Sequence, residues 1–337
     1  MANICLYPCM ALDAICYLQQ RCFNDRKWMN NEEILIIEKI NGITNDRIDD
    51  NYLSMSTLSL IISTYTDNIN LEKCTIDDLI NIFKNVDDVD IVVRNRITNE
   101  FVASYVFPML DFLKDGWAEN YITKFQTLKS INFEKVWREE IYPKVIEQIE
   151  RKKKSIKNFD TEKLFKNISL MKGTNEISDI KIYISFFSYP TAFTLYNNCF
   201  LDTFGDNIDL PFMIAHELMH GFASNELIEL YIKCINEYEY LKNCHQMLVE
   251  HYHSGNEEEF VIAAEYYICY KLGIISKEKI FELAKQRYNK CIPLSLIIFE
   301  ELSNEKSVPR DYNKWLVDKF SGDVFFIDNI KKYINLL

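Results

Sequence analysis

The sequence predicts a mostly α-helical protein of the α+β class, and three observations support this prediction. Glycine (8 of 337 residues) and proline (7) are scarce, so few tight turns can be built and long helices are favoured. Apolar residues recur at helical spacing along most of the chain. The clearest β-like alternation lies within residues 180–201. We therefore expect a helical N-terminal region over residues 1–175 and a second domain over residues 176–337, with a small β-sheet or hairpin and a helical C-terminal portion.

The N-terminal region divides into several expected helices. Asn31 is a candidate N-cap for one helix, and Thr75 opens another with an apolar face. Asn132 is expected to cap a long helix that Pro143 kinks. Residues 54–66 form an apolar segment that fits either a helix or a strand. No residue pattern in this region indicates chemistry, so we interpret it as a scaffold or as one wall of a substrate cleft.

Two β-like runs begin the second domain, at residues 180–187 and 192–201. The tetrapeptide Ser188-Tyr189-Pro190-Thr191 lies between them and predicts a β-hairpin. An extended peptide could add to the edge of such a hairpin, although the hairpin could equally form only the floor of the core. Helical patterns then follow over residues 227–249 and from Glu257 to a stop at Gly273.

The charge balance argues against a nucleic-acid partner. The formal net charge is −12 and the pI is near 5.1, whereas phosphate backbones require clustered Lys and Arg. The only basic run is Arg151-Lys152-Lys153-Lys154. We interpret this run as a solvated helix end that complements the helix dipole, and a partner-binding patch is the less favoured alternative.

The cysteines and the N-terminus bear on location. None of the ten cysteines forms a C-x-x-C pair, so a zinc-ribbon site is not expected. The N-terminus lacks the basic segment of a signal peptide, and no stretch of about 18 apolar residues predicts a membrane span. We therefore expect a cytoplasmic protein in a reduced setting, without a membrane partner. The sequence does not indicate an oligomeric state.

The main functional signal is His216-Glu217-Leu218-Met219-His220, which spells H-E-x-x-H. On a helix the two histidines face the same way, one turn apart, and both can reach one Zn²⁺ at ~2.0–2.1 Å. Glu217 can act as general base on a metal-bound water that attacks a carbonyl. The flanking residues are apolar, and buried histidines need partners that a metal supplies. We expect one zinc per chain, with Glu217 as the catalytic residue.

The third metal ligand must come from outside this helix, because the motif does not continue as H-x-x-G-x-x-H. An acidic run, Glu257-Glu258-Glu259, opens a later helix, and Glu265 lies two turns into it. Acids are also favoured at a helix N-terminus without any metal, and Asn256 with Glu259 fits a capping box. Glu259 is our first choice as ligand, since Ala263 and Ala264 would let the two helices approach closely. Glu258 and Glu265 remain alternatives, either as the ligand or as the acceptor for a histidine's outer N–H.

The residue that would stabilise an oxyanion is not determined by the sequence. Several side chains downstream of the motif could donate a hydrogen bond to it. These are His251, His253, Tyr288, Arg310 and Tyr312.

With these residues in place, the sequence resembles the zincin metallopeptidases, and in particular the gluzincins. His216, Glu217 and His220 match the family motif, and the run Glu258-Glu259-Phe260 is similar to the glutamate-bearing second helix of several gluzincins. That helix often carries another acid four residues later, whereas this chain has Ala263. The resemblance implies a zincin-like domain with an active-site helix, a bound Zn²⁺, and a peptide or protein substrate.

Three functions fit these observations. The first is a zinc-dependent metallopeptidase that hydrolyses peptide bonds with water activated by Glu217. The second is a non-catalytic helical binding protein on a zincin scaffold, and the third is a metal-dependent hydrolase of a non-peptide amide. The presence of Glu217 favours catalysis, because a structural metal site has no use for a base at that position.

Overall fold

The computed structural model describes residues 3–20, 35–36, 55–67, 71–174, 177, 179–187, 192–203, 210–252, 254–322, 324–325 and 327–337. Most of the helix expected after Asn31 lies outside these residues, and so does the turn expected at residues 188–191. Within the described residues the protein is mostly helical and contains one small sheet of four strands. The mostly α, α+β class is thereby confirmed.

The chain divides into two compact units that are not consecutive in sequence. We call the first the sheet unit, which comprises Asn3–Lys154 and Asp179–Asn207. The second, the helical unit, comprises Ser155–Ser178 and Ile208–Leu337. The expected boundary after residue 175 does not coincide with this division. The strands near residue 180 belong with the N-terminal residues, because their hydrogen-bonding partner is a strand near the start of the chain.

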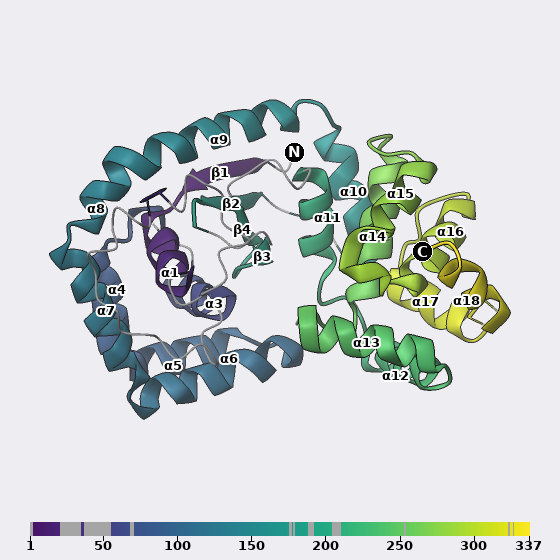
Figure 1. The fold of residues 1–337 in the computed structure, drawn as a ribbon, viewed down its shortest axis with the longest axis horizontal. Helices are drawn as coiled ribbons and strands as arrows, with labels where there is room; N and C mark the ends of the chain where they lie inside the picture. The colour runs from purple at the N-terminus through teal and green to yellow at the C-terminus, as the bar shows by residue number, and fades with distance from the viewer. Residues whose placement is uncertain are drawn as a thin grey trace. The chain divides into compact units, whose positions relative to one another are not determined.

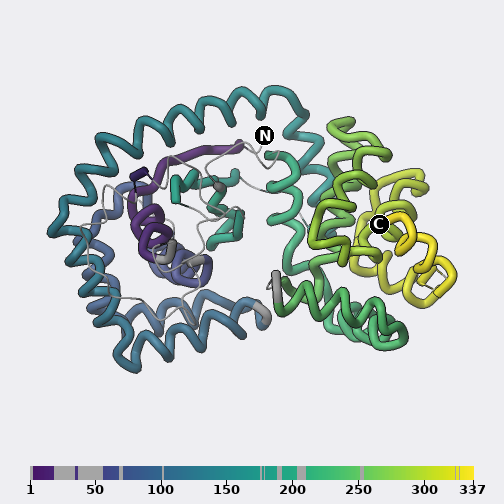
Figure 2. Tube along the Cα trace, viewed as in Figure 1, coloured from purple at the N-terminus to yellow at the C-terminus, as the bar shows by residue number. Residues whose placement is uncertain are grey.

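The sheet unit is built on four strands in the order β1-β2-β4-β3. They are β1 (Ile4–Pro8), β2 (Ile180–Ser185), β3 (Phe193–Thr194) and β4 (Cys199–Thr203). β1 pairs in parallel with β2, β2 pairs in parallel with β4, and β3 runs antiparallel to β4. Figure 2 shows the first strand, in purple, beside strands that follow about 175 residues later, in teal.

The predicted hairpin between residues 180–187 and 192–201 is therefore wrong. β2 has a parallel neighbour on each side, and five of its six residues are buried. Such two-sided burial is typical of a central parallel strand, whereas an exposed hairpin alternates between buried and solvated residues. β1 was not anticipated, because it is short and lies far from its partner in the sequence.

Helices accompany the strands in the described part of the sheet unit, and Figure 1 shows them around the strands. The segment that fitted either a helix or a strand is α3. The helix start predicted at Thr75 is confirmed, and Thr75 is its N-cap, since its hydroxyl accepts the N–H of Asp78 at 3.2 Å in a capping box. The helices and helical turns are α1 (Met10–Gln20), α3 (Met55–Thr66), η2 (Leu71–Lys73), α4 (Ile76–Lys84), α5 (Val86–Arg96), α6 (Glu100–Phe112), η3 (Leu113–Trp117), α7 (Ala118–Ser130), α8 (Phe133–Val136), η4 (Trp137–Ile141) and α9 (Tyr142–Ile156).

The long helix expected after Asn132 is interrupted. Asn132 has a left-handed backbone with φ 57° and makes no side-chain cap, so its predicted capping role is wrong. A π-helical turn, η4, follows α8 and leads into α9, whose second residue is Pro143. A proline cannot donate to the preceding turn and clashes with it, and a π-turn is a common way to accommodate such a break.

A buried carboxyl, Asp13 on α1, ties this helix to the end of β2. Its Oδ1 accepts hydrogen bonds from Ser185 Oγ and the Phe186 N–H, both at 2.6 Å, and its Oδ2 accepts one from Trp137 Nε1 at 2.7 Å. Burial raises the pKa of this carboxyl from 3.8 to about 6, against the effect of these hydrogen bonds. The folded state therefore holds this proton more tightly than the unfolded chain.

The raised pKa of Asp13 makes stability depend on pH. The stabilisation that Asp13 provides by binding a proton is complete below pH 3.8, and it is lost as the pH rises through about 6. We expect Asp13→Asn to lack this fall in stability with rising pH, because asparagine cannot ionise. The unfolding free energy of the wild type, measured relative to the variant by urea titration, should fall by roughly 2–2.5 kcal/mol between pH 4 and pH 7. Parallel pH profiles for the two proteins would contradict the assignment.

A buried ion pair joins α9 to β4 within the sheet unit. Lys152 Nζ lies 2.9 Å from Asp202 Oδ2, and the two side chains are 7% and 1% exposed. The neighbouring Arg151 and Lys153 are exposed, as expected for a solvated helix end, and pair with Glu147 and Glu150 of the same helix. The interpretation of this basic run is therefore correct for its exposed members and wrong for Lys152, which points into the protein.

The helical unit contains the remaining helices. α14 packs against α11 and against α16, and Figures 1 and 2 show it between them. None of the helices in the described part of the chain is both long and apolar enough to cross a membrane. The helices are α10 (Thr161–Lys172), α11 (Leu210–Met219), α12 (Asn225–Asn236), α13 (Glu239–Tyr252), α14 (Glu258–Lys271), α15 (Lys277–Ala284), η5 (Arg287–Lys290), α16 (Pro293–Asn304), α17 (Tyr312–Phe320) and α18 (Ile327–Ile334).

Candidate metal centre

α11 carries the H-E-x-x-H motif, as the sequence predicts. His216 and Glu217 lie in its last turn, and His220 directly follows its final residue. The Nε2 atoms of the two histidines are 3.3 Å apart, so the i, i+4 spacing brings both rings to one point. Gly221 then turns the chain away with φ +75°, a conformation that favours glycine at a helix C-terminus.

Two contacts hold the end of α11 in place. Lys172 on α10 donates from Nζ to the carbonyl oxygens of Leu218, at 2.7 Å, and His220, at 3.0 Å. The Gly221 N–H donates to Glu257 Oε1 at 2.7 Å. Burial lowers the pKa of Lys172, although the charge of Glu257 opposes this. A cation at a helix C-terminus also complements the helix dipole, so the backbone that carries His220 is fixed from two sides.

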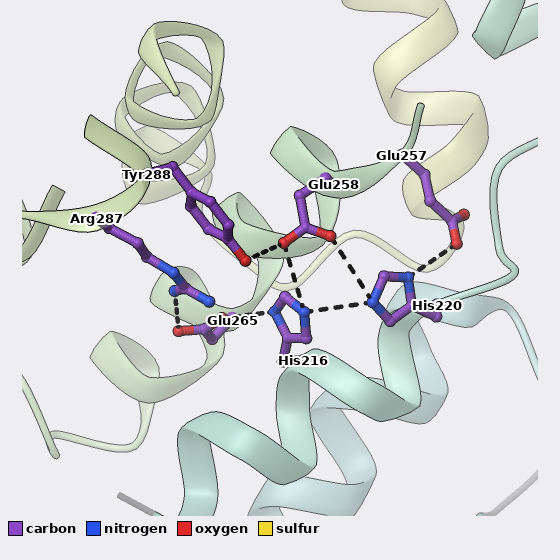
Figure 3. Close-up of polar contacts among 7 residues, drawn as sticks. All are labelled: His216, His220, Glu257, Glu258, Glu265, Arg287 and Tyr288. Atoms are coloured by element: carbon purple, nitrogen blue, oxygen red, sulfur yellow. Dashed lines mark hydrogen bonds and ion pairs between the residues drawn. The ribbon is translucent and has the colours of Figure 1, made fainter. Parts of the chain in front are cut away.

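The acidic member of the cluster is Glu258, at the start of α14 (Figure 3). Its Oε1 lies 3.7 Å from His216 Nε2 and its Oε2 lies 4.0 Å from His220 Nε2. Two ligands bound at ~2.05 Å in a tetrahedral zinc site are separated by roughly 3.3 Å. One ligand atom from each of the three residues lies within 4.8 Å of the others, so these atoms would have to draw together by up to about 1.5 Å to share one ion.

Each histidine is oriented by a second carboxylate on the far side of its ring. His216 Nδ1 lies 2.8 Å from Glu265 Oε2, and His220 Nδ1 lies 3.0 Å from Glu257 Oε1. A carboxylate accepts only, so in the neutral form of each histidine the proton belongs on Nδ1 and the lone pair on Nε2. Carboxylate–histidine pairs of this kind orient metal ligands and increase their basicity. The two rings therefore present the correct nitrogen atoms to the cluster.

The segment after α15 contacts two of the carboxylates of α14, those of Glu265 and Glu258 (Figure 3). Arg287 Nη1 donates to Glu265 Oε1 at 2.7 Å, and the Tyr288 hydroxyl donates to Glu258 Oε1 at 2.7 Å. Burial and the nearby charge of Glu258 raise the pKa of Tyr288, so the phenol remains a hydrogen-bond donor at neutral pH. Tyr288 is one of the candidate oxyanion donors named from the sequence, and it is the one that the structure brings to the cluster.

The charges of the cluster favour a cation at its centre. Burial opposes a charged imidazole, but the hydrogen bond to Glu257 and the charges of Glu258 and Glu217 raise the pKa of His220 to about 9. Burial also opposes the ionisation of Glu257, yet its hydrogen bond with His220 lowers its pKa. At neutral pH a proton therefore balances part of the negative charge, and a divalent ion would displace it on binding.

Glu259, the first choice from sequence, lies away from the cluster. Its Oε2 accepts the N–H groups of Leu294, at 2.7 Å, and Ser295, at 3.1 Å, and its Oε1 accepts the Tyr231 hydroxyl at 3.2 Å. Burial raises the pKa of Glu259 to about 8, so it is mostly protonated near pH 7. The structure therefore groups Glu258, and not Glu259, with the two histidines, and Glu259 instead caps the start of α16.

The other residues named from sequence fall in different places. Glu265 takes the second of its two anticipated roles, as the acceptor for His216. Tyr312 is fully buried and donates to the carbonyl oxygen of Phe260 at 3.0 Å, which removes it from the oxyanion candidates. Arg310 is exposed. His253 lies outside the described residues, and the side chain of His251 is not described either.

Sequence reasoning missed the roles of three residues around the cluster. Glu257 was considered only as a member of the acidic run that opens this helix, and neither Lys172 nor Arg287 was considered. Lys172 lies in the last turn of its own helix, where a basic residue is common for local reasons. Arg287 precedes Tyr288 in an irregular segment. No spacing rule connects these positions to the motif, so only the packing of helices shows their roles.

Comparisons with known proteins identify no relative. No protein-family model matches the sequence, and no curated protein or solved structure matches it. A function for this chain therefore rests on the geometry of His216, His220 and Glu258 and on the carboxylates around them.

Proposed function

We propose that this chain is a zinc-dependent metallopeptidase, as expected of a gluzincin-like sequence. The observation that supports this most directly is the arrangement of three ligand atoms within reach of one ion, with both histidines oriented by carboxylates. Two nitrogen ligands and one oxygen ligand form a set that suits Zn²⁺ and leaves a fourth position open for catalysis.

The residues of the cluster would divide the chemistry as follows. Zinc, when bound, would polarise the scissile carbonyl and acidify the attacking water. Glu217, next to His216 on α11, would accept the proton of that water and pass it to the leaving amine. Tyr288, which is protonated at neutral pH, would turn its hydroxyl from Glu258 to donate a hydrogen bond to the developing oxyanion. Glu257 and Glu265 would hold the two imidazole rings throughout.

Metal analysis of variants tests this proposal and its choice of ligand. We expect about one zinc per wild-type chain by elemental analysis after zinc is supplied and excess is removed. His216→Ala and Glu258→Ala should lose the ion, because two ligands bind zinc far more weakly than three. Glu259→Gln should keep it, because glutamine mimics the protonated carboxyl that caps α16. Circular dichroism should show that each variant is folded.

The possible results separate the candidate functions. A wild type that binds no zinc overturns the proposal and leaves a helical binding protein. Loss of zinc in Glu259→Gln but not in Glu258→Ala would overturn the ligand set. Zinc binding without hydrolysis of any peptide in a broad mixture would favour the non-catalytic alternative, in which the ion is structural.

A further inference from the structure

Arg287 is linked to the proposed metal site through two successive contacts. Its Nη1 lies 2.7 Å from Glu265 Oε1, and the other oxygen of the same carboxylate lies 2.8 Å from His216 Nδ1. The guanidinium, the carboxylate and the imidazole thus form one line that ends at a ligand nitrogen (Figure 3). Among the described contacts, Arg287 hydrogen-bonds Glu265, which is not one of the three proposed ligands, so its direct polar route to the metal runs through this carboxylate.

The surroundings of Glu265 explain why it needs a cation. Its side chain is 4% exposed, and neighbouring residues of α14 such as Ile262 and Ile268 are buried and apolar. An ionised carboxylate in such a place is costly unless it is paired. A histidine that is to bind a metal through Nε2 is neutral and cannot supply that charge. Among the described residues, Arg287 is the cation that pairs with Glu265.

The guanidinium is held in place by aromatic rings and by an unusual backbone. Arg287 Cζ lies 5.8 Å from the ring centre of Tyr266 and 5.4 Å from that of Tyr288. The next residues, Tyr288, Asn289 and Lys290, have φ of 48°, 49° and 68°. Left-handed backbone at three successive non-glycine residues is disfavoured and is found most often where function requires it. The segment thereby brings Arg287 within hydrogen-bonding distance of Glu265, and Tyr288 within hydrogen-bonding distance of Glu258.

We infer that Arg287 is a positioning residue for metal binding. By holding Oε1 of Glu265, it keeps Oε2 against the Nδ1–H of His216, so that His216 Nε2 faces Glu258 and His220. This inference rests on the proposed metal site and adds a residue that lies outside the H-E-x-x-H motif. The carboxylate would otherwise be free to turn or to take up a proton, and His216 would lose the acceptor that fixes its ring.

The affinity of the whole chain for Zn²⁺, measured by competition with a chromophoric chelator, tests this role. We expect Arg287→Met to weaken zinc binding by ~10–100-fold, the range typical for loss of an outer hydrogen-bonding partner. Arg287→Lys keeps the charge and should recover most of the affinity. Arg310→Met, which removes an exposed arginine of the same unit, should bind as the wild type does. The visible absorption spectrum of bound Co²⁺ should change in Arg287→Met but not in Arg310→Met.

A double-mutant cycle shows whether Arg287 acts through Glu265. If it does, adding Arg287→Met to Glu265→Gln should weaken zinc binding by less than twofold beyond Glu265→Gln alone. A full additional loss, or an Arg287→Met affinity within twofold of the wild type, overturns the inference while leaving the metal site intact. A wild type that binds neither ion overturns both. Should Arg287→Met fail to fold, Arg287→Gln takes its place with the same thresholds.

Discussion

Glu217→Gln is expected to lower the rate of peptide hydrolysis by ~10²–10⁴-fold, the usual contribution of a general base, while zinc content stays near one per chain. Glutamine keeps the shape of Glu217 but cannot accept a proton. His216, His220 and Glu258 remain, so the metal site should persist. Cleavage would be measured by mass spectrometry on a broad peptide mixture, with a single identified substrate used for the kinetics.

A matched control for this variant is Glu226→Gln. Glu226 is an exposed residue in the first turn of α12, and its substitution should leave hydrolysis unchanged. If Glu217→Gln retained wild-type activity, the role of Glu217 as base would be refuted. If it lost zinc as well as activity, Glu217 would act in holding the site rather than in proton transfer.

Lys152→Met is expected to destabilise the sheet unit by about 3–5 kcal/mol, because it removes the cation that pairs with the buried carboxylate of Asp202. A loss of this size is a large fraction of the stability of an ordinary domain. Urea titration followed by circular dichroism would measure it, and hydrogen exchange of β2 and β4 amides would assign it to the sheet unit.

Two further variants make this prediction specific. Lys153→Met alters the adjacent residue, whose side chain is 50% exposed, and should change stability by less than about 1 kcal/mol. The double variant Lys152→Met with Asp202→Leu removes both charges and should recover most of the loss, since well-packed apolar pairs can replace buried ion pairs. Equal effects of Lys152→Met and Lys153→Met would contradict the buried pairing.

The parts of the site that follow from local geometry could be predicted from sequence. Four residues on a helix make one turn, so the approach of His216 and His220 depends only on α11 being helical. The choice between Glu258 and Glu259 depends on which side of α14 meets α11. Every residue from Glu258 to Cys269 is buried, so no polar face marks the side that meets solvent and the sequence carries no orientation signal. Adjacent residues then point about 100° apart, one to the metal cluster and one to α16.

The sheet also shows that local sequence patterns cannot reveal contacts between residues far apart in the chain. The runs near residues 182 and 200 were correctly expected to be strands, because strand propensity and apolar runs are local properties. Their relative direction is set by β1, since β2 lies between two parallel neighbours. The spacing between two runs cannot reveal a third strand that lies far away in sequence. The same reason explains why Lys152 was placed among solvated residues, as its partner lies on β4.

The pairing of β1 with β2 has a consequence for biosynthesis. In the growing polypeptide, Ile4–Pro8 has no strand to pair with until Ile180–Ser185 has left the ribosome. Asp13 must wait equally long for the hydroxyl of Ser185 and the amide of Phe186. Contacts so distant in sequence form slowly, and an unpaired strand is prone to aggregate while it waits. A chain that has not yet released Ile180–Ser185 is therefore expected to be more prone to aggregation than the whole protein.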